Sequence, residues 1–197
     1  MKKCRIIGGK LKRRYIIAPD TSSTRPTSDI VKQSVFNVLV HRFCVNFEKT
    51  FVIDLFAGSG SLGIEAVSFG CKNVVFIDSN KKAIDCIKQN IQSLQIAPFS
   101  ATICQSAEKV PDSIFLTFGE NHSDILVFLD PPYAKKELLC QQIGRFFELF
   151  KSKNLLIVAE SDEEYADATY VIRHGNTRVN ILCTYENSAC KTISAGS

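Results

Sequence analysis

The residues best suited to chemistry are Asp130-Pro131-Pro132-Tyr133. They follow the apolar run 125–129, which predicts a strand buried on both faces. The two prolines end this strand, because neither has an N–H to donate to a neighbouring strand. A carboxylate, a rigid turn and an aromatic ring therefore stand at the carboxyl end of a strand, where open α/β sheets bind ligands. The plainer alternative is a strand-ending turn with a solvated aspartate.

A second candidate is the glycine-rich segment 54–63, between a predicted strand and a predicted helix. Gly58, Gly60 and Gly63 match the G-x-G-x-x-G fingerprint, in which glycines let the backbone approach a ligand at a helix N-terminus. Asp78 ends the next strand about twenty residues later, where a carboxylate accepts hydrogen bonds from ribose hydroxyls. An ordinary strand-end turn is the alternative for Asp78. A dinucleotide and S-adenosylmethionine both fit this pattern.

Asp54 favours S-adenosylmethionine, because a carboxylate repels a pyrophosphate but attracts a cationic sulfonium and an amino group. The Asp130 turn has no part in hydride transfer, and a terminal antiparallel hairpin does not fit a second mononucleotide-binding half. After the third strand, Ser106 lies where such folds contact adenine, although a plain helix cap explains it equally well. The residues expected to bind the cofactor are Asp54, Phe56, Ala57, Gly58, Ser59, Gly60, Asp78, Ser79, Ser106 and Ala107.

Strands and helices alternate from residue 50, which predicts βαβ units and a parallel sheet with helices on both faces. After residue 165 two apolar runs flank His174-Gly175-Asn176 and predict a terminal antiparallel hairpin. The predicted strands are 51–53, 74–77, 101–104, 125–129 and 155–158, and the predicted helices are 60–69, 84–94, a weak one near 107–118, and 139–150.

The first 48 residues read as an extension that precedes the first core strand. A hairpin is predicted to turn at Gly8-Gly9, and Thr27 or Ser28 is predicted to cap a helix. We therefore expect an extension over 1–48, a catalytic domain over 49–186 and a frayed tail over 187–197.

Charge is concentrated at the N-terminus. The net charge is +4, and residues 1–14 carry seven basic side chains and no acid, so the other 183 residues sum to −3. Such an arm indicates a phosphate-rich partner, with a solvated, solubilising end as the alternative. The basic residues expected to contact RNA are Lys2, Lys3, Arg5, Lys10, Lys12, Arg13, Arg14 and, in the following loop, Arg25.

The composition is that of an ordinary globular protein, with 45% hydrophobic and 22% charged residues. No apolar run approaches the roughly 20 residues of a membrane span, and the N-terminus lacks a signal-peptide core. The eight cysteines include no C-x-x-C pair. We expect a cytoplasmic protein without disulfides or metal, and a monomer by default.

Three blocks of sequence carry a resemblance to a known family: 5–10; 25–29 with Phe36-Asn37; and 54–63 with 130–133. With these blocks the chain resembles class I methyltransferases that modify exocyclic amines, and more narrowly the bacterial 16S ribosomal RNA (guanine-N2)-methyltransferases of the small subunit. Lys32 and Gln33 depart from the Arg and Glu usual in that family, and Ser106 from its Asp or Asn.

The resemblance implies a Rossmann-like fold with a mostly parallel seven-stranded sheet, and S-adenosylmethionine as the methyl donor. It also implies ribosomal RNA as partner, within the assembling small subunit. Asp130 and the carbonyl of Pro131 would accept the hydrogens of the guanine amine, Pro132 would hold the turn rigid, and Tyr133 would stack on the flipped base.

Three other functions remain open at this stage. The same turn serves DNA methyltransferases that act on adenine N6 or cytosine N4, although these usually carry a larger recognition region. A non-catalytic nucleotide-binding module and a dinucleotide oxidoreductase are the others.

Overall fold

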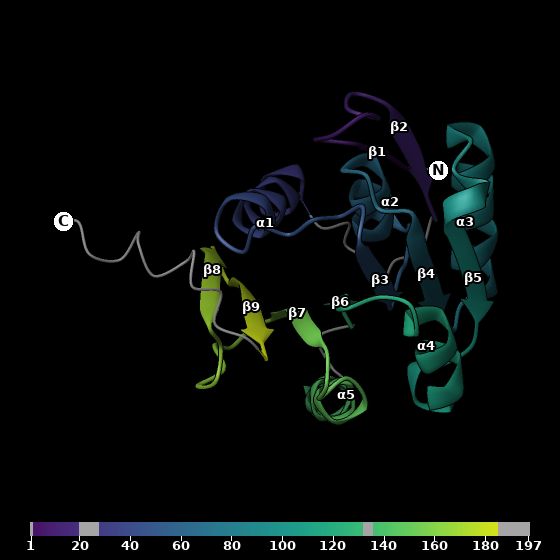
Figure 1. The fold of residues 1–197 in the computed structure, drawn as a ribbon. Coiled ribbons are helices and arrows are strands. Elements are labelled where there is room, and N and C mark those ends of the chain that lie inside the picture. The colour runs from purple at the N-terminus through teal and green to yellow at the C-terminus, as the bar shows by residue number, and fades with distance from the viewer. Residues whose placement is uncertain (1, 20–27, 132–135, 185–197) are drawn as a thin grey trace.

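The computed structural model describes residues 2–19, 28–131 and 136–184. The main sheet contains β3 (Thr50–Leu55), β4 (Asn73–Asp78), β5 (Ser100–Cys104), β6 (Asp124–Leu129), β7 (Asn154–Ser161), β8 (Tyr170–His174) and β9 (Thr177–Cys183). Its strand order is β5-β4-β3-β6-β7-β9-β8 (Figure 1). The strands β3 to β7 are parallel, and β9 is antiparallel to both β7 and β8. This confirms the predicted mostly parallel sheet with a C-terminal antiparallel hairpin.

Helices cover both faces of the sheet (Figure 1). The helices α1 (Asp29–His41), α2 (Ser61–Ser68) and α3 (Lys81–Leu94) pack on one face, and α4 (Asp112–Gly119) and α5 (Lys136–Leu149) on the other. Alternate strand residues enter the two cores, as Phe128 and Val127 do. Burial on both sides explains the continuous apolar runs of the strand sequences.

The sheet has its switch point at β3. From β3 the chain moves outward through β4 to β5, then crosses back to β6 on the other side of β3. Connections therefore leave β3 and β6 in opposite directions, which opens a crevice at their carboxyl ends. The glycine-rich segment follows β3 and the Asp130 turn follows β6, so both predicted motifs stand at this crevice.

The N-terminal hairpin consists of β1 (Lys2–Arg5) and β2 (Tyr15–Ala18). The predicted N-terminal hairpin is confirmed, but it does not turn at Gly8-Gly9, because residues 6–14 form a longer connection that lies against the end of α2. A Cβ on Gly9 would stand 2.0 Å from the carbonyl oxygen of Ser68, and one on Gly8 would stand 2.3 Å from the ring of Phe69. The two glycines serve a close approach between segments instead of a turn.

A buried ion pair fastens this hairpin to the core. Lys32 on α1 and Glu65 on α2 are each 1% exposed, and their Nζ and Oε1 atoms are 3.3 Å apart. Lys32 also donates to the carbonyl of Arg5 at 2.7 Å, and Glu65 accepts from the N–H of Ile7 at 2.8 Å. Removing the charge of Lys32 would leave the buried carboxylate of Glu65 without its cation, which is costly.

The weak helix near 107–118 is interrupted in the structure. It consists of a short 3-10 turn, η2 (Ala107–Lys109), and α4, with Val110 and Pro111 between them. Pro111 lacks the N–H that a continuous helix needs there. A second 3-10 turn, η1 (Ala97–Phe99), precedes β5.

The capping prediction for α1 is confirmed at Ser28, whose side chain accepts from the N–H of Val31 at 3.2 Å.

Within residues 2–19, 28–131 and 136–184, no helix is long and apolar enough to cross a membrane. The same described residues contain no cluster of three His, Cys, Asp or Glu side chains that could hold a metal ion.

Candidate active site at the carboxyl edge of the sheet

One cavity of about 960 Å³ opens at the carboxyl ends of β3, β4, β6 and β7. It brings the glycine-rich loop and the Asp130 turn together. Of the predicted cofactor residues, all but Gly60 line it. Of the predicted catalytic residues, Asp130 and Pro131 line it, while Pro132 and Tyr133 lie outside the described residues. The lining from the sequence prediction is Asp54, Phe56, Ala57, Gly58, Ser59, Asp78, Ser79, Ser106, Ala107, Asp130 and Pro131.

The loop after β3 has an unusual backbone. Gly58 and Gly60 have φ values of 55° and 76°, and Phe56 adopts a φ of 75° although it is not glycine. A bulky residue at positive φ is strained. The strain is held in place because the N–H groups of Phe56 and Ala57 both donate to the carbonyl of Ile77, at 3.0 and 2.9 Å. These hydrogen bonds fix the loop to β4, so the backbone that leads into α2 has a defined conformation.

Gly63 allows α2 to approach the sheet. A Cβ at this position would lie 2.4 Å from the ring of Phe76 and 3.0 Å from the carboxylate of Asp54. The close approach lets the N–H of Gly63 donate to Asp54 Oδ2 at 2.9 Å. The third glycine of the fingerprint thus positions the helix against a carboxylate.

Asp54 is a buried acid, with only 3% of its surface exposed. Burial raises its pKa to about 7, although the hydrogen bond from Gly63 lowers the pKa, and the neighbouring charge of Asp78 raises it further. A nearby positive charge would favour the ionised form of Asp54. A cationic ligand would therefore be favoured beside Asp54.

Asp78 connects the loop to the end of β4. Its Oδ2 accepts from the N–H of Gly58 and its Oδ1 accepts from the N–H of Asn80, both at 2.8 Å. A carboxylate offers about four acceptor positions, so each oxygen keeps capacity for a second donor. Asp78 both shapes the glycine loop and remains able to accept from ribose hydroxyls.

The charge of the cavity distinguishes the two cofactors that the fingerprint allowed. Among the described residues, its lining includes no Lys or Arg. A pyrophosphate would meet uncompensated negative charge, whereas a sulfonium and an amino group would be attracted. The residues therefore fit S-adenosylmethionine better than a dinucleotide. The acidic residues of the lining are Asp54, Asp78, Glu108, Asp130, Glu160 and Asp162.

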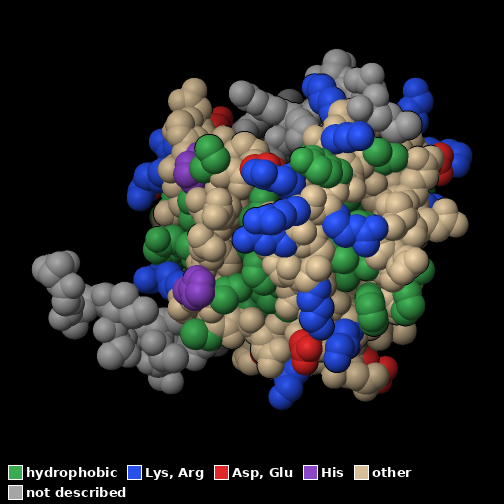
Figure 2. All heavy atoms as spheres, turned by 90° about the horizontal axis from the view of Figure 1, so that it is seen from above, with side chains coloured by type: hydrophobic (Ala, Val, Ile, Leu, Met, Phe, Trp, Pro, Cys, Tyr) green, Lys and Arg blue, Asp and Glu red, His purple; other side chains and the backbone are tan. Residues whose placement is uncertain are grey.

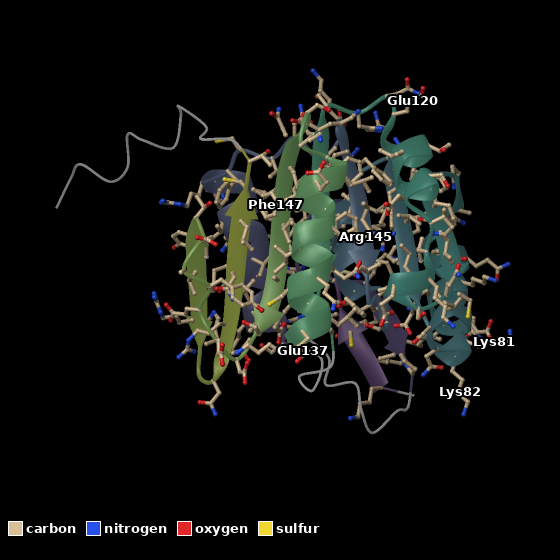
Figure 3. All side chains as sticks on the ribbon, turned by 90° about the horizontal axis from the view of Figure 1, so that it is seen from below. Lys81, Lys82, Glu120, Glu137, Arg145 and Phe147 are labelled. Atoms are coloured by element: carbon tan, nitrogen blue, oxygen red, sulfur yellow. The ribbon has the colours of Figure 1, made fainter. Side chains whose placement is uncertain are left out.

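A side chain of α5 forms hydrogen bonds with the segment that contains Ser106 and Ala107. Arg145 lies on the side of α5 that faces α4 (Figure 3) and donates to the carbonyls of Ala107 at 2.9 Å and Val110 at 2.5 Å. Its guanidinium also stands 5.2 Å from the ring centre of Phe115. Ser106 is the N-cap residue of η2, but its side chain makes no capping hydrogen bond. The helix-cap alternative is therefore weakened, and the adenine contact stays a prediction.

The predicted RNA-binding side chains lie on the surface. Lys2, Lys3 and Arg5 line a second groove of about 520 Å³ beside Tyr15, whose side chain is 59% exposed. Figure 2 views the molecule from the side on which the hairpin lies in Figure 1, and it shows Lys and Arg side chains gathered across the middle of this face, with few acidic ones. All the predicted arm residues are exposed except Arg25, which lies outside the described residues; they are Lys2, Lys3, Arg5, Lys10, Lys12, Arg13 and Arg14.

A family model described as "Conserved hypothetical protein 95" matches residues 4–179. The chain belongs to this family. Among its relatives, YlbH of Bacillus subtilis is 36% identical over 162 residues, which cover 81% of this chain and 83% of YlbH. The protein named ribosomal RNA small subunit methyltransferase D is 34% identical in Haemophilus influenzae and 31% identical in Escherichia coli K12. Each of these two matches covers 66% of this chain, and the chain spans 63% and 61% of their respective lengths.

Solved structures agree with the class I methyltransferase fold. The Escherichia coli protein yhhF is 26% identical and superimposes with a TM-score of 0.69, over 92% of this chain and 98% of its own. An RNA methyltransferase from Salinibacter ruber, solved with S-adenosyl-L-homocysteine, is 14% identical and reaches a TM-score of 0.60, over 83% of this chain and 95% of its own. At that identity the second likeness concerns the fold alone.

In this member of the conserved hypothetical protein 95 family, sequence reasoning missed one end of the cavity. Glu160 is the last residue but one of β7, and Asp130 directly follows β6. A search of the residues at the carboxyl ends of the strands could therefore have found Glu160. The turn of the β8–β9 hairpin was not accessible in that way, because only an antiparallel pairing brings it to the cavity. The missed residues at this end are Ser28, Val31, Glu160, Asp162, His174, Gly175, Asn176 and Thr177.

Proposed function

We propose that this chain is an S-adenosylmethionine-dependent methyltransferase that modifies the exocyclic N2 amine of a guanine in 16S ribosomal RNA. The observation that carries the proposal is the acidic cavity at the carboxyl edge of the sheet. It places the carboxylates of Asp54 and Asp78 and the Asp130-Pro131 turn around one space. Methyl transfer needs a donor and an acceptor amine held together in such an enclosure.

The cofactor half of the cavity is assigned to the glycine loop, Asp54, Asp78 and the loop around Ser106. S-adenosylmethionine supplies an electrophilic methyl group when it is bound. Asp54 would attract the positive end of the ligand, and Asp78 would accept from its ribose. A protein of the same fold was solved with S-adenosyl-L-homocysteine, the product that S-adenosylmethionine leaves after methyl transfer, which supports this choice of cofactor.

The acceptor half is assigned to Asp130 and Pro131. The exocyclic amine of guanine is a poor nucleophile, because its lone pair is delocalised into the ring. Asp130 would accept one amine hydrogen and the Pro131 carbonyl the other, which turns the lone pair toward the methyl donor. Asp130 is also placed to take the proton that the amine loses when its bond to carbon forms.

The choice of RNA is supported by the names of the relatives and by the basic hairpin. The pairing of Lys2 with Ala18 puts the start of the hairpin beside the cavity, since Ala18 belongs to its lining. Lysines there would hold the RNA backbone without reading sequence. We assign residues 1–48 to RNA binding and 49–186 to catalysis on this basis.

The test is a methylation assay with labelled S-adenosylmethionine on free 16S ribosomal RNA, assembled small subunits and duplex DNA. We expect label on RNA or subunits, recovered as N2-methylguanosine. Asp130→Asn should reduce turnover by at least about 10³-fold, because the amide cannot take the proton, while calorimetry finds cofactor affinity nearly unchanged. Label on DNA instead, or undiminished turnover by Asp130→Asn, would contradict the proposal.

A further inference from the structure

Glu160 lies beside Asp130 at the carboxyl edge of the sheet. The parallel strands β6 and β7 pair Leu129 with Ala159, so Asp130 and Glu160 are the next residues in the same register. Neighbouring strands are about 4.8 Å apart, and residues in register point the same way. Both are partly exposed, and both line the acidic cavity.

The two carboxylates belong to one face of the sheet. Phe128 and Val158, two residues before them, enter the core beneath α1, α2 and α3. The period of two along a strand therefore directs Asp130 and Glu160 to that side. Asp54, two residues after Val52 of the same core, lies on this face as well. Donor-side and acceptor-side carboxylates thus share one face.

This end of the cavity is enclosed by elements distant in sequence. Val31 of α1 and the turn between β8 and β9 both line it. The hydroxyl of Ser34 on α1 and Nε2 of His174 at that turn are 2.9 Å apart, which joins the two walls. A flat ring between these walls would present its edge to the adjacent carboxylates of Asp130 and Glu160.

The edges of the bases differ in what they offer to a pair of carboxylates. Guanine presents its N1–H directly beside its N2 amine, so it has two neighbouring donor groups. Adenine and cytosine each present an unprotonated ring nitrogen beside their amine. A carboxylate stabilises the first arrangement by accepting the ring N–H, and it repels the lone pair of the second.

We propose that Glu160 accepts the N1–H of the target guanine while Asp130 accepts a hydrogen of its N2 amine, so that Glu160 selects guanine among bases with an exocyclic amine. This inference rests on the proposed guanine-N2 function and adds a specificity residue to it. A site built around a donor N–H discriminates strongly against an analogue that lacks it, because its own polar group is then unpaired.

The test compares guanine with 2-aminopurine at the methylated position of the RNA. 2-Aminopurine keeps the amine at C2 but carries a lone pair at N1 in place of the N1–H. We expect wild-type protein to prefer guanine in kcat/KM by about 10²-fold or more. Glu160→Gln should narrow this preference by about tenfold or more, because the new amide can donate to N1 of 2-aminopurine.

Two further variants control the experiment. Glu148→Gln makes the same change on an exposed residue of α5, outside the cavity, and should leave the preference unaltered. Glu160→Asp keeps a carboxylate and should retain a preference for guanine even if Glu160→Gln folds poorly. Calorimetry of cofactor binding should give equal affinities for all variants.

The outcomes separate the inference from the function beneath it. If wild-type protein labels no guanine N2, the proposed function fails and this inference fails with it. If wild-type protein is active but Glu160→Gln slows guanine and 2-aminopurine equally, the function stands and the inference is overturned. An unchanged preference in Glu160→Gln, or its loss in Glu160→Asp, overturns it too.

Discussion

At the scale of single residues, Asp54 links the electrostatics of the cavity to folding. It is fully buried, and its pKa of about 7 in the folded protein stands well above its ordinary value of 3.8. Between these values the folded state holds a proton that the unfolded chain releases. The free energy of unfolding therefore falls as the pH rises from about 4 to about 7, and levels off above that.

Asp54→Asn should remove this part of the pH dependence, since an amide does not titrate and its oxygen can still accept from the N–H of Gly63. A folded-state pKa of about 7 corresponds to a loss on the order of 2–3 kcal/mol between pH 5 and pH 8 in the wild-type protein. Urea unfolding at pH 5 and pH 8 measures this loss. Between the two pH values, the free energy of unfolding of Asp54→Asn should fall by about 2–3 kcal/mol less than that of the wild-type protein.

The matched control for this measurement is Asp167→Asn, because Asp167 is an exposed aspartate outside the cavity. The free energy of unfolding of this variant should depend on pH as that of the wild-type protein does. If Asp54→Asn also follows the wild-type curve, Asp54 is not the group that carries the elevated pKa. A cationic ligand at the proposed cofactor site would draw Asp54 into its ionised form and release a proton.

At the scale of elements, Arg145 links α5 to the proposed cofactor site, although Arg145 does not line the cavity. It donates to the carbonyls of Ala107 and Val110 and forms an ion pair with Asp112, whose oxygen is 2.5 Å from Nη2. These bonds hold the segment between β5 and α4 in place. Arg145 is thus a positioning residue for the loop that lines the cavity.

Arg145→Ala should weaken the cofactor affinity by roughly tenfold, because one or two hydrogen bonds that order the loop are lost. The KM for the cofactor should rise by that factor while kcat at saturating cofactor stays close to wild type. Lys151→Ala removes an exposed cation just beyond α5 and should alter neither constant. A fall in kcat with an unchanged cofactor KM would contradict the positioning role.

Elements with strong local signals were predictable from the sequence. The strand from Phe51 and the strand ending at Leu129 carry buried apolar runs bounded by glycine or proline, and the structure has both. Pro111 could have indicated the break between η2 and α4, but the apolar residues on either side of it favoured one continuous helix. Periodicity and turn residues therefore predicted the strands and the mostly parallel sheet, whereas the order of the strands comes from the structure.

The far wall of the cavity was not predictable in the same way. His174 and Ser34 are 140 residues apart, and their contact depends on how α1 packs across the terminal hairpin. The anchoring role of Lys32 was equally hidden, because a lysine in a helix ordinarily indicates an exposed face. Only the fold shows Lys32 to be 1% exposed and paired with Glu65. Both features depend on contacts between residues far apart in the sequence, which local sequence patterns do not indicate.

At the scale of the whole molecule, the basic hairpin and the acidic cavity form two surfaces with opposite charge. The hairpin is not a loose arm: Glu65 accepts from the N–H groups of Ile7 and Gly8, and Ser68 accepts from that of Lys10. Deleting residues 1–14 would take these N–H donors away from the buried Glu65 and Ser68 and destabilise the core. A test of RNA binding must therefore remove charge and keep the backbone.

Lys2, Lys3 and Lys10 meet that need, because their side chains are exposed and no part of the Glu65 anchor uses them. Replacing all three with Gln should make the slope of log K for RNA binding against log salt shallower by about 2, since each lost phosphate contact removes about 0.7–0.9. The matched triple change at Lys49, Lys72 and Lys151, all exposed and outside the hairpin, should leave the slope intact. Equal slopes for both triple variants would mean that the hairpin serves solubility, whereas a loss confined to the first would make it the surface that holds the RNA backbone beside the cavity.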